Sequence, residues 1–286
     1  MTMELSYLQA AITGFVQGIT ELFPISSLGH AVLVPAWIGG SWKDFTTDPQ
    51  SPYLTITIAL HLASAIALFL FFRKRWFSLI GSGLNSLRGK RSETGGVFWM
   101  IVVATIPVGA LGFLFEHKFQ DLFAKPIASA LFLTINGCIL IFAERISRRG
   151  ASANEDEIHE YSERIGLKSA VAIGFAQSLA LFAGISRFGV SMSAGLVRGL
   201  SHSSASDFAF LLALPVILGA SVAKLPELFT SANSHLAGPI ILGCAISGVA
   251  TYASVAFLVK WFKTKTLYPF AIYCLVLGVA SLIRFA

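Results

Sequence analysis

Charged residues are scarce in this chain. Only 13% of its 286 residues are Asp, Glu, Lys or Arg, whereas 55% are hydrophobic, and the mean hydropathy is +0.73. A water-soluble domain of this length needs far more polar surface. The composition therefore excludes a soluble globular protein and indicates a membrane protein.

Cysteine is also rare, and the N-terminus lacks the features of a signal peptide. Cys138, Cys244 and Cys274 lie inside apolar stretches, without the spacing of a metal site or a disulfide framework, so redox chemistry is not expected. The first residues contain neither a basic region nor a small-residue cleavage site. We therefore expect this segment to remain on the mature protein.

Six uncharged apolar segments are long enough to cross a hydrocarbon core of about 30 Å as helices. They lack the polar and apolar alternation of barrel strands. The segments are 54–72, 96–115, 127–143, 208–223, 238–259 and 267–283. The predicted fold is all-α: a polytopic membrane protein with a single membrane domain, 1–286.

Four further apolar pieces are too short to cross, and they come in two pairs. Residues 5–20 and 28–40 are separated by PISSLG, and residues 169–183 and 188–200 by AGISRFG. Paired short segments broken by Gly and Ser are typical of re-entrant helical hairpins. We expect one such hairpin in each half of the chain.

The two hairpins resemble each other in sequence. A gapless shift of 160 residues gives six identities in 17 columns, against roughly one or two expected from composition. The identities pair Gly14 with Gly174, Phe15 with Phe175, Gln17 with Gln177, Ile25 with Ile185, Ser26 with Ser186, and Gly29 with Gly189. This predicts repeat one at 1–143, a cytoplasmic linker at 144–168 and repeat two at 169–286. Each repeat has one hairpin and three spans, and an odd number of crossings makes the repeats inverted.

Basic residues set the expected orientation. The connections 73–95, 144–168, 198–206 and 260–266 carry 15 Lys and Arg, and the opposite side carries five. Cytoplasmic loops are enriched in Lys and Arg, so these connections are predicted to be cytoplasmic and both termini extracytoplasmic. The net charge of +6 is explained by such loops, and no nucleic-acid partner is expected.

The first hairpin turn gathers unusual polar residues. Gln17 and Glu21 share a helix face, and the turn then supplies Ser26, Ser27 and His30. The imidazole could act as nucleophile or as general acid and base. Glu21 could orient the imidazole, act as a base, or hold a divalent cation.

The second turn supplies an arginine. An intramembrane arginine costs several kcal/mol unless it meets water or an anion, so Arg187 is a candidate functional residue. Its planar fork suits phosphate oxygens, and the helix N-termini after Pro24 and Gly184 favour anions. If the two turns meet, they form a site suited to phosphoryl transfer on a lipid substrate.

Together these segments identify a resemblance. QGITELFPISSLGH at 17–30, AGISRFGVS at 183–191 and YPFAIY at 268–273 resemble motifs of the bacterial undecaprenyl-pyrophosphate phosphatase family, the bacitracin-resistance type. The family removes the terminal phosphate of the C55 isoprenoid pyrophosphate carrier for peptidoglycan synthesis. The resemblance implies an enzyme of the bacterial inner membrane whose active site opens to the extracytoplasmic side.

The resemblance also implies site residues and a cofactor. The catalytic set is Glu21, Ser27, His30, Ser186 and Arg187, with Gln17, Ser26, Gly184, Gly189 and Ser191 at the substrate. It implies a requirement for Mg²⁺ or Ca²⁺, with Glu21 as the metal ligand. The expected partners are a polyprenyl pyrophosphate lipid and the bilayer, and a homodimer is allowed.

The chain departs from the commonest family pattern at four positions. Gln17 replaces a frequent second Glu, while Ala183, Phe188 and Ser191 replace a proline, a serine and a threonine. A single carboxylate leaves the metal site in question. A weaker activity, or another lipid phosphate as substrate, stays open.

Other interpretations of the same residues also stay open. Arg187 could pair with Glu21 and merely join the hairpins, and the four serines could be turn or cap residues. His61, inside the first span, is interpreted as an interhelical hydrogen-bond partner rather than a proton carrier. The alternative function is a transporter or flippase for a polyprenyl phosphate or another anion, because inverted repeats also build transporters.

Overall fold

The computed structural model describes residues 5–42, 53–115, 125–147, 161, 164–228 and 236–286, and in these it contains helices and no β-strand. Six of the helices are long and apolar enough to cross a membrane. They are α4 (Tyr53–Leu87), α5 (Glu93–Leu114), α7 (Pro126–Ser147), α11 (His202–Leu228), α12 (Ala237–Trp261) and α13 (Tyr268–Phe285). The predicted all-α fold with six spans is confirmed.

Helix α4 extends much further than its predicted span. The backbone leaves helical geometry at Phe72 (φ −95°, ψ 15°), where the predicted span ends, and then continues as a helix to Leu87. The second part packs against α5. A Cβ atom at Gly83 would lie 2.2 Å from the Phe98 ring, so the absent side chain allows this approach. Most of the predicted 73–95 connection is therefore helical, which hydropathy alone does not predict.

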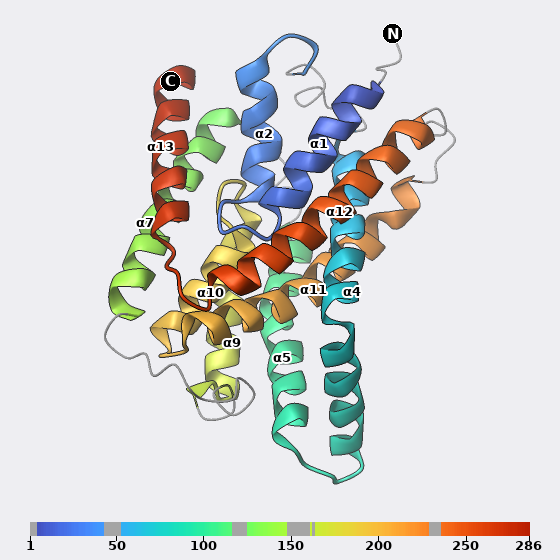
Figure 1. The fold of residues 1–286 in the computed structure, drawn as a ribbon, viewed down its shortest axis with the longest axis vertical. Coiled ribbons are helices and arrows are strands. Elements are labelled where there is room, and N and C mark those ends of the chain that lie inside the picture. Colours follow the sequence, from blue (N-terminus) through green and yellow to red (C-terminus); the bar gives the residue numbers. More distant parts are fainter. Residues whose placement is uncertain (1–4, 43–52, 116–124, 148–160, 162–163, 229–235) are drawn as a thin grey trace.

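Both predicted hairpins are present as helix–turn–helix units. The first consists of α1 (Tyr7–Thr20) and α2 (Ser27–Ile38). The second consists of α9 (Leu167–Ser178), a 3₁₀ turn (Leu179–Leu181) and α10 (Arg187–Val197). At 1.5 Å per residue, none of these helices spans a 30 Å core. Figure 1 shows the two turns meeting near the middle of the molecule.

Each hairpin is packed on a long helix from the other half of the chain. Helix α1 lies along α12, and α9 lies along α5 (Figure 1). A Cβ atom on Gly14 would be 2.3 Å from the backbone oxygen of Gly243, and one on Gly174 would be 2.4 Å from that of Ala104. Gly14 and Gly174 are a pair in the 160-residue alignment. The two halves thus share element order and close packing, and their inverted relation stays a prediction.

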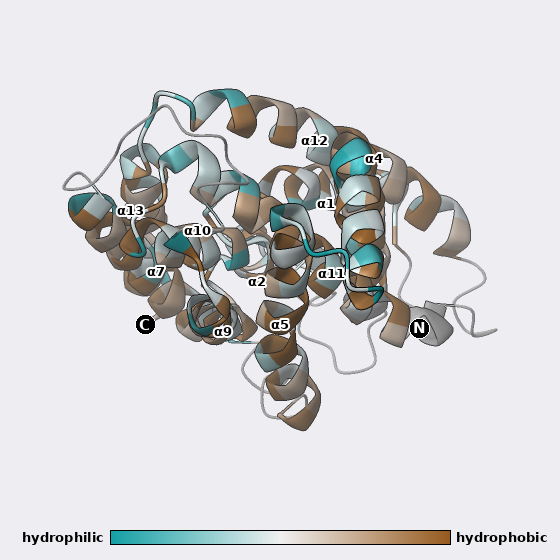
Figure 2. Cartoon of the chain, turned by 90° about the horizontal axis from the view of Figure 1, so that it is seen from below, coloured by the Kyte–Doolittle hydropathy of each residue, from teal (hydrophilic) through white to brown (hydrophobic). Residues whose placement is uncertain are grey.

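Helix α11 is the most enclosed of the six long helices, and its Phe208 and Phe210 side chains are fully buried. The other long helices expose large apolar side chains such as Phe113 and Ile283. Seen from the α4–α5 end, hydrophilic residues gather near helix ends and the helix sides are hydrophobic (Figure 2). This surface is suited to lipid contact.

The predicted linker 144–168 is only partly visible. Residues 148–160 and 162–163 lie outside the described part of the structure. At its start α7 continues to Ser147, and near its end Tyr161 and Ile165 are fully buried in the main core. The linker therefore contributes apolar side chains to the core of the molecule.

Candidate active site

The two turns end in the same kind of side-chain cap. Ser26 precedes α2 and its Oγ accepts a hydrogen bond from the Gly29 N–H at 3.1 Å, while Ser186 precedes α10 and its Oγ accepts from the Gly189 N–H at 3.0 Å. Both are N-caps, which satisfy backbone donors at a helix start. The aligned serines and glycines of the predicted repeat therefore have matching roles.

The turns contact each other directly. The Gly184 N–H donates to Ser26 Oγ at 3.1 Å, and Ser186 Oγ donates to the Phe23 carbonyl at 3.2 Å. Gly184 has φ +117° and lies so close to Ser129 that a Cβ atom would be 2.4 Å from its carbonyl oxygen. Only glycine fits this position without strain. The predicted meeting of the two half-sites is confirmed.

Asn136 fastens both turns to α7. Its Nδ2 donates to the Pro24 carbonyl at 2.9 Å, and its Oδ1 accepts from the Ser186 N–H at 3.0 Å. Asn136 is fully buried. Asn136 belongs to neither sequence motif, although a lone amide within an apolar span is itself a signal of interhelical hydrogen bonding.

Glu21 is the centre of the first half-site. Its Oε2 accepts from Gln17 Nε2 at 2.7 Å and from Ser27 Oγ at 2.5 Å, and lies 3.2 Å from His61 Nε2. Gln17 therefore acts as a hydrogen-bond donor that orients the Glu21 carboxylate. Among the described residues no hydrogen bond reaches Oε1, so this oxygen is left for another ligand.

His61 brings a positive charge to the carboxylate. Its Nδ1 lies 2.7 Å from the Thr57 carbonyl oxygen, and its Nε2 faces Glu21 Oε2. A carbonyl and an ionised carboxylate can only accept, so beside an ionised Glu21 the ring donates at both nitrogens and is an imidazolium. His61 is an interhelical partner, as interpreted from the sequence, but its partner is the central residue of the site.

Arg187 and Glu21 lie in the same cavity. A hollow of about 250 Å³ is lined by Glu21, Ser26, Ser27, Leu28, Ala180, Ile185, Ser186 and Arg187. The Arg187 Nε and Nη1 atoms are buried and have no hydrogen-bond partner among the described residues, and no ion pair with Glu21 is formed there. Two buried guanidinium donors without partners are a place for an anion.

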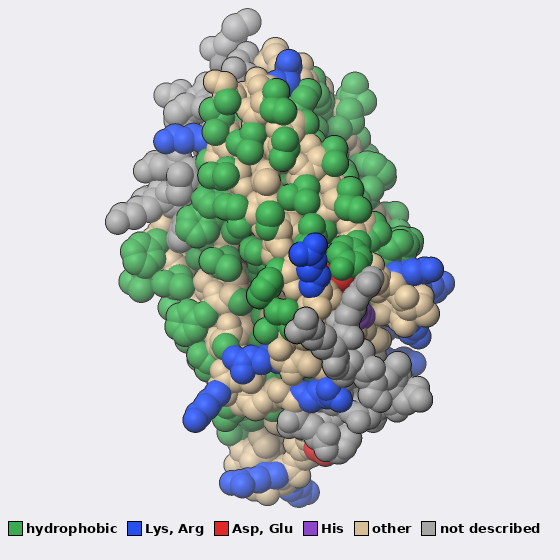
Figure 3. Space-filling model, turned by 90° about the vertical axis from the view of Figure 1, so that its left-hand side faces the viewer, with side chains coloured by type: hydrophobic (Ala, Val, Ile, Leu, Met, Phe, Trp, Pro, Cys, Tyr) green, Lys and Arg blue, Asp and Glu red, His purple; other side chains and the backbone are tan. Residues whose placement is uncertain are grey.

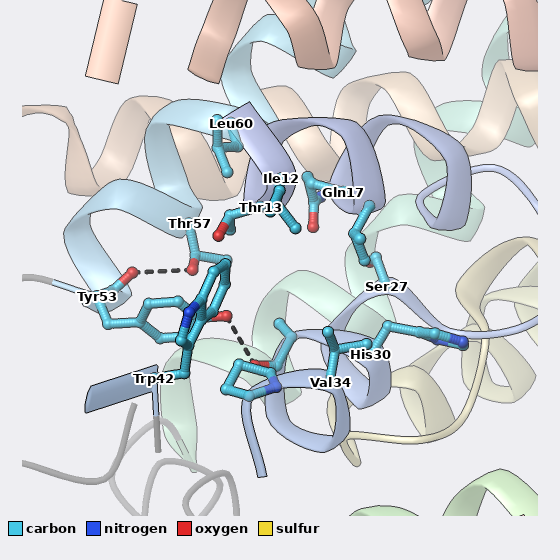
Figure 4. Close-up of a pocket in the computed structure, with 13 residues that line it drawn as sticks. Ile12, Thr13, Gln17, Ser27, His30, Val34, Trp42, Tyr53, Thr57 and Leu60 are labelled. Atoms are coloured by element: carbon cyan, nitrogen blue, oxygen red, sulfur yellow. Dashed lines mark hydrogen bonds between the residues drawn. The ribbon is translucent and has the colours of Figure 1, made fainter. Parts of the chain in front are cut away.

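His30 lies to one side of this hollow. It lines a second cavity of about 340 Å³ with Gln17 and Ser27, and otherwise mainly with apolar residues of α1, α2 and α4. Figure 4 shows its ring turned away from Trp42 and Tyr53. Its Nδ1 is 2.7 Å from the Ser26 carbonyl, and its Nε2 is 2.8 Å from the Tyr273 hydroxyl. Ser27 lines both cavities and so connects them.

Three residues of the second motif lie elsewhere. Ser191 is buried in α10 with no hydrogen-bond partner for its Oγ among the described residues, and it lines neither cavity. Gly189 contributes its backbone to the α10 cap. Phe188 stacks on Phe210 with ring centroids 4.5 Å apart. Its departure from the family serine thus fills the core rather than altering the wall of the Glu21–Arg187 hollow.

Comparison with known proteins identifies the family of this chain. A model of the family described as bacitracin resistance protein BacA matches residues 10–280. Undecaprenyl-diphosphatase 2 of Frankia alni is 44% identical over 99% of each chain. The undecaprenyl-diphosphatase of Mycolicibacterium paratuberculosis is 45% identical over 100% of this chain and 99% of its own, and undecaprenyl-diphosphatase 2 of Chromobacterium violaceum is 38% identical over 96% and 98%. With matches over nearly its whole length, the chain belongs to the bacitracin resistance protein BacA family.

Proposed function

We propose that this protein is a membrane phosphatase that hydrolyses undecaprenyl pyrophosphate to undecaprenyl phosphate and phosphate, returning the lipid carrier to peptidoglycan synthesis. Relatives named undecaprenyl-diphosphatase at 44% and 45% identity support the activity. The observation that carries it is the hollow in which Glu21, Ser27, Ser186 and Arg187 meet, with two Arg187 donors unpaired.

The charges around the hollow favour a pyrophosphate. Arg187 and the imidazolium of His61 contribute two positive charges against the single negative charge of Glu21. The first helical turns of α2 and α10 begin at Ser27 and Arg187 and present free backbone N–H groups. The guanidinium fork would hold phosphoryl oxygens and stabilise the charge that develops on them during transfer.

His30 is proposed to carry the chemistry next to this anion site. Either its unprotonated nitrogen attacks the terminal phosphorus and the bond to the bridging oxygen breaks, or it takes a proton from the water that attacks there. In both cases the lipid phosphate leaves with the electron pair of the broken bond. Parallel quenching in acid and in base, with a radiolabel on the terminal (β) phosphate, separates the two, because phosphohistidine is lost in acid and retained in base.

A divalent cation is proposed to bind with the substrate. The described residues hold no group of three His, Cys, Asp or Glu side chains suited to a metal. Mg²⁺ commonly takes only one or two carboxylates and completes its shell with water and substrate phosphates, and Glu21 Oε1 is available. A bound cation would neutralise pyrophosphate charge. Glu21 Oε1 and the pyrophosphate oxygens would thus be the ligands of the cation, together with water.

The proposed orientation places both termini and the opening of the active site outside the cytoplasm. Lys and Arg side chains gather toward the lower end of the face in Figure 3, below a broad apolar band. This supports a cytoplasmic α4–α5 end. In a variant without the three native cysteines, Lys90→Cys should resist a membrane-impermeant maleimide added to intact cells, and Ala286→Cys should react. The opposite labelling would overturn the orientation. A homodimer remains a prediction.

The function is tested by phosphate release from undecaprenyl pyrophosphate in detergent. Wild-type protein should be active, and His30→Ala and Arg187→Ala should each lower kcat/KM by at least about 100-fold. Arg198→Ala is the matched control, because Arg198 is the C-cap residue at the far end of α10 and its Nη1 donates to Ser169 Oγ in an exposed hydrogen bond. Unchanged release in both site variants would contradict the site, and an inactive wild type would contradict the function.

A further inference from the structure

Tyr273 lies beside His30 without being part of either hairpin. It belongs to the YPFAIY segment at the start of α13. Its hydroxyl is 2.8 Å from His30 Nε2, and the two rings are nearly parallel, with centroids 5.7 Å apart and an interplanar angle of 8°. Helix α13 packs along α7, the helix that holds both turns through Asn136. The Tyr273 phenol therefore comes from the pair of helices, α7 and α13, that supports the two turns.

The hydrogen bonds of His30 determine its tautomer. Its Nδ1 faces the Ser26 carbonyl, which can only accept, so Nδ1 carries a proton. In the neutral ring Nε2 then has the lone pair, and the Tyr273 hydroxyl donates to it. His30 thus differs from His61, whose two neighbours are both acceptors.

This arrangement bears on both proposed roles of His30. Attack on phosphorus and acceptance of a proton each require an unprotonated ring nitrogen. The Ser26 carbonyl fixes one nitrogen, and the Tyr273 hydroxyl fixes the other and the rotation of the ring. Without the hydroxyl, the Nε2 side of the imidazole has no polar partner among the described residues.

We infer that Tyr273 is a positioning residue of the active site, whose hydroxyl holds His30 in the tautomer with the lone pair on Nε2 and gives up that hydrogen bond when Nε2 reacts with the substrate. The inference rests on the proposed phosphatase function. Among the described residues, this bond is the only one made by the Tyr273 hydroxyl. Removing the hydroxyl therefore changes the contact with His30 and leaves the ring packing in place.

The variant Tyr273→Phe tests the inference, with Tyr252→Phe as its matched control. Tyr252 lies on α12, is 45% exposed against 43% for Tyr273, and packs by its ring on Phe71, with no hydrogen bond from its hydroxyl in the described residues. Tyr273→Phe should lower kcat for phosphate release about tenfold and leave KM within about twofold. Tyr252→Phe should match wild type. Equal kinetics for the two variants would overturn the inference.

A spectroscopic measurement gives a second readout that does not depend on activity. In protein with ¹⁵N-labelled histidine rings, the His30 signals are those lost in His30→Gln. Wild type should show a protonated Nδ1 and a hydrogen-bonded, unprotonated Nε2, and Tyr273→Phe should shift the Nε2 resonance or mix the tautomers. Identical spectra would overturn the role of Tyr273. If wild type released no phosphate, the proposed function would fail, while these spectra would still decide how Tyr273 acts on His30.

Discussion

His61 Nε2 lies 3.2 Å from Glu21 Oε2, so a histidine from the first long helix reaches the carboxylate of the first hairpin. Both groups are largely buried, with side-chain exposures of 12% and 3%. Breaking such a pair leaves a buried charge without compensation. The pair joins α4 to the turn and also contributes to the charge of the candidate site.

Loss of His61 should therefore impair catalysis. In His61→Ala, Glu21 either takes up a proton or draws Arg187 away from the substrate, and we expect kcat/KM to fall at least about tenfold. His202→Ala is the matched control. His202 Nε2 lies 2.9 Å from Oε2 of buried Glu144, and neither residue lines the hollow. Compared at equal folded fraction, His202→Ala should retain activity. If His61→Ala were as active as His202→Ala at equal folded fraction, His61 would act only on stability.

Gln17→Glu tests whether a divalent cation binds beside the single carboxylate of Glu21. Gln17 now donates to Glu21 Oε2 at 2.7 Å, and a glutamate would replace that donor with a like charge. Two adjacent carboxylates favour a cation between them. Half-maximal phosphate release should then occur at a lower free Mg²⁺ concentration than in wild type.

The control for this change is Gln17→Ala, which removes the donor without adding charge. It should lower the rate of phosphate release without lowering the free Mg²⁺ concentration that gives half-maximal release. If Gln17→Glu and Gln17→Ala showed the same Mg²⁺ titration curve, binding of a cation beside Glu21 would be contradicted.

Asn136→Ala should weaken the connection between the two turns. It leaves the Ser186 N–H buried without a partner, at a cost of about 1–3 kcal/mol, and leaves the Pro24 carbonyl with only the weak Cys274 thiol donor at 3.7 Å. Both thermal stability in detergent and phosphate release below the unfolding transition should fall. Thr134→Val removes only a bond within α7, to the Ala130 carbonyl, and should change the unfolding free energy by less than about 1 kcal/mol. An unchanged Tm in Asn136→Ala would contradict the role of the amide.

Gly14→Ala tests the packing of α1 on α12. The added Cβ would be 2.3 Å from the Gly243 oxygen, so the helices must separate, and overpacking of this kind costs about 1–3 kcal/mol. Gly109→Ala has nothing within 4 Å of its new Cβ and, in a helix interior, should be neutral or stabilising. A Tm for Gly14→Ala at or above that of Gly109→Ala would argue against this close contact.

Much of the fold follows from hydropathy alone. Each predicted span overlaps a long helix because a run of uncharged residues must form internal hydrogen bonds in lipid. Helix ends were harder to predict, since α4 continues past Phe72 into a charged segment held by contacts with α5. Hydropathy describes transfer into lipid, and it carries no information on such tertiary packing.

The site was predictable where both motifs contribute. Glu21, Ser27, Ser186 and Arg187 are in the turns, and their meeting follows from the repeat. Asn136 and Tyr273 come from spans, where a single amide or phenol among apolar residues has no motif around it. His61 stands out in the sequence as an ionisable residue within a span, but its contact with Glu21 depends on the angle between α1 and α4, which the sequence does not specify.

The crossed packing of the hairpins also determines when the site can form during synthesis. Glu21 is near the start of the chain, yet its helix lies on α12, which ends at Trp261, and its turn is fastened to Ser186 through Asn136. Neither half of the chain can pack its own hairpin alone, because each hairpin packs on a long helix from the other half. Glu21 is therefore among the first residues to leave the ribosome and among the last to reach its final surroundings, and a chain that ends before α12 cannot complete the candidate site.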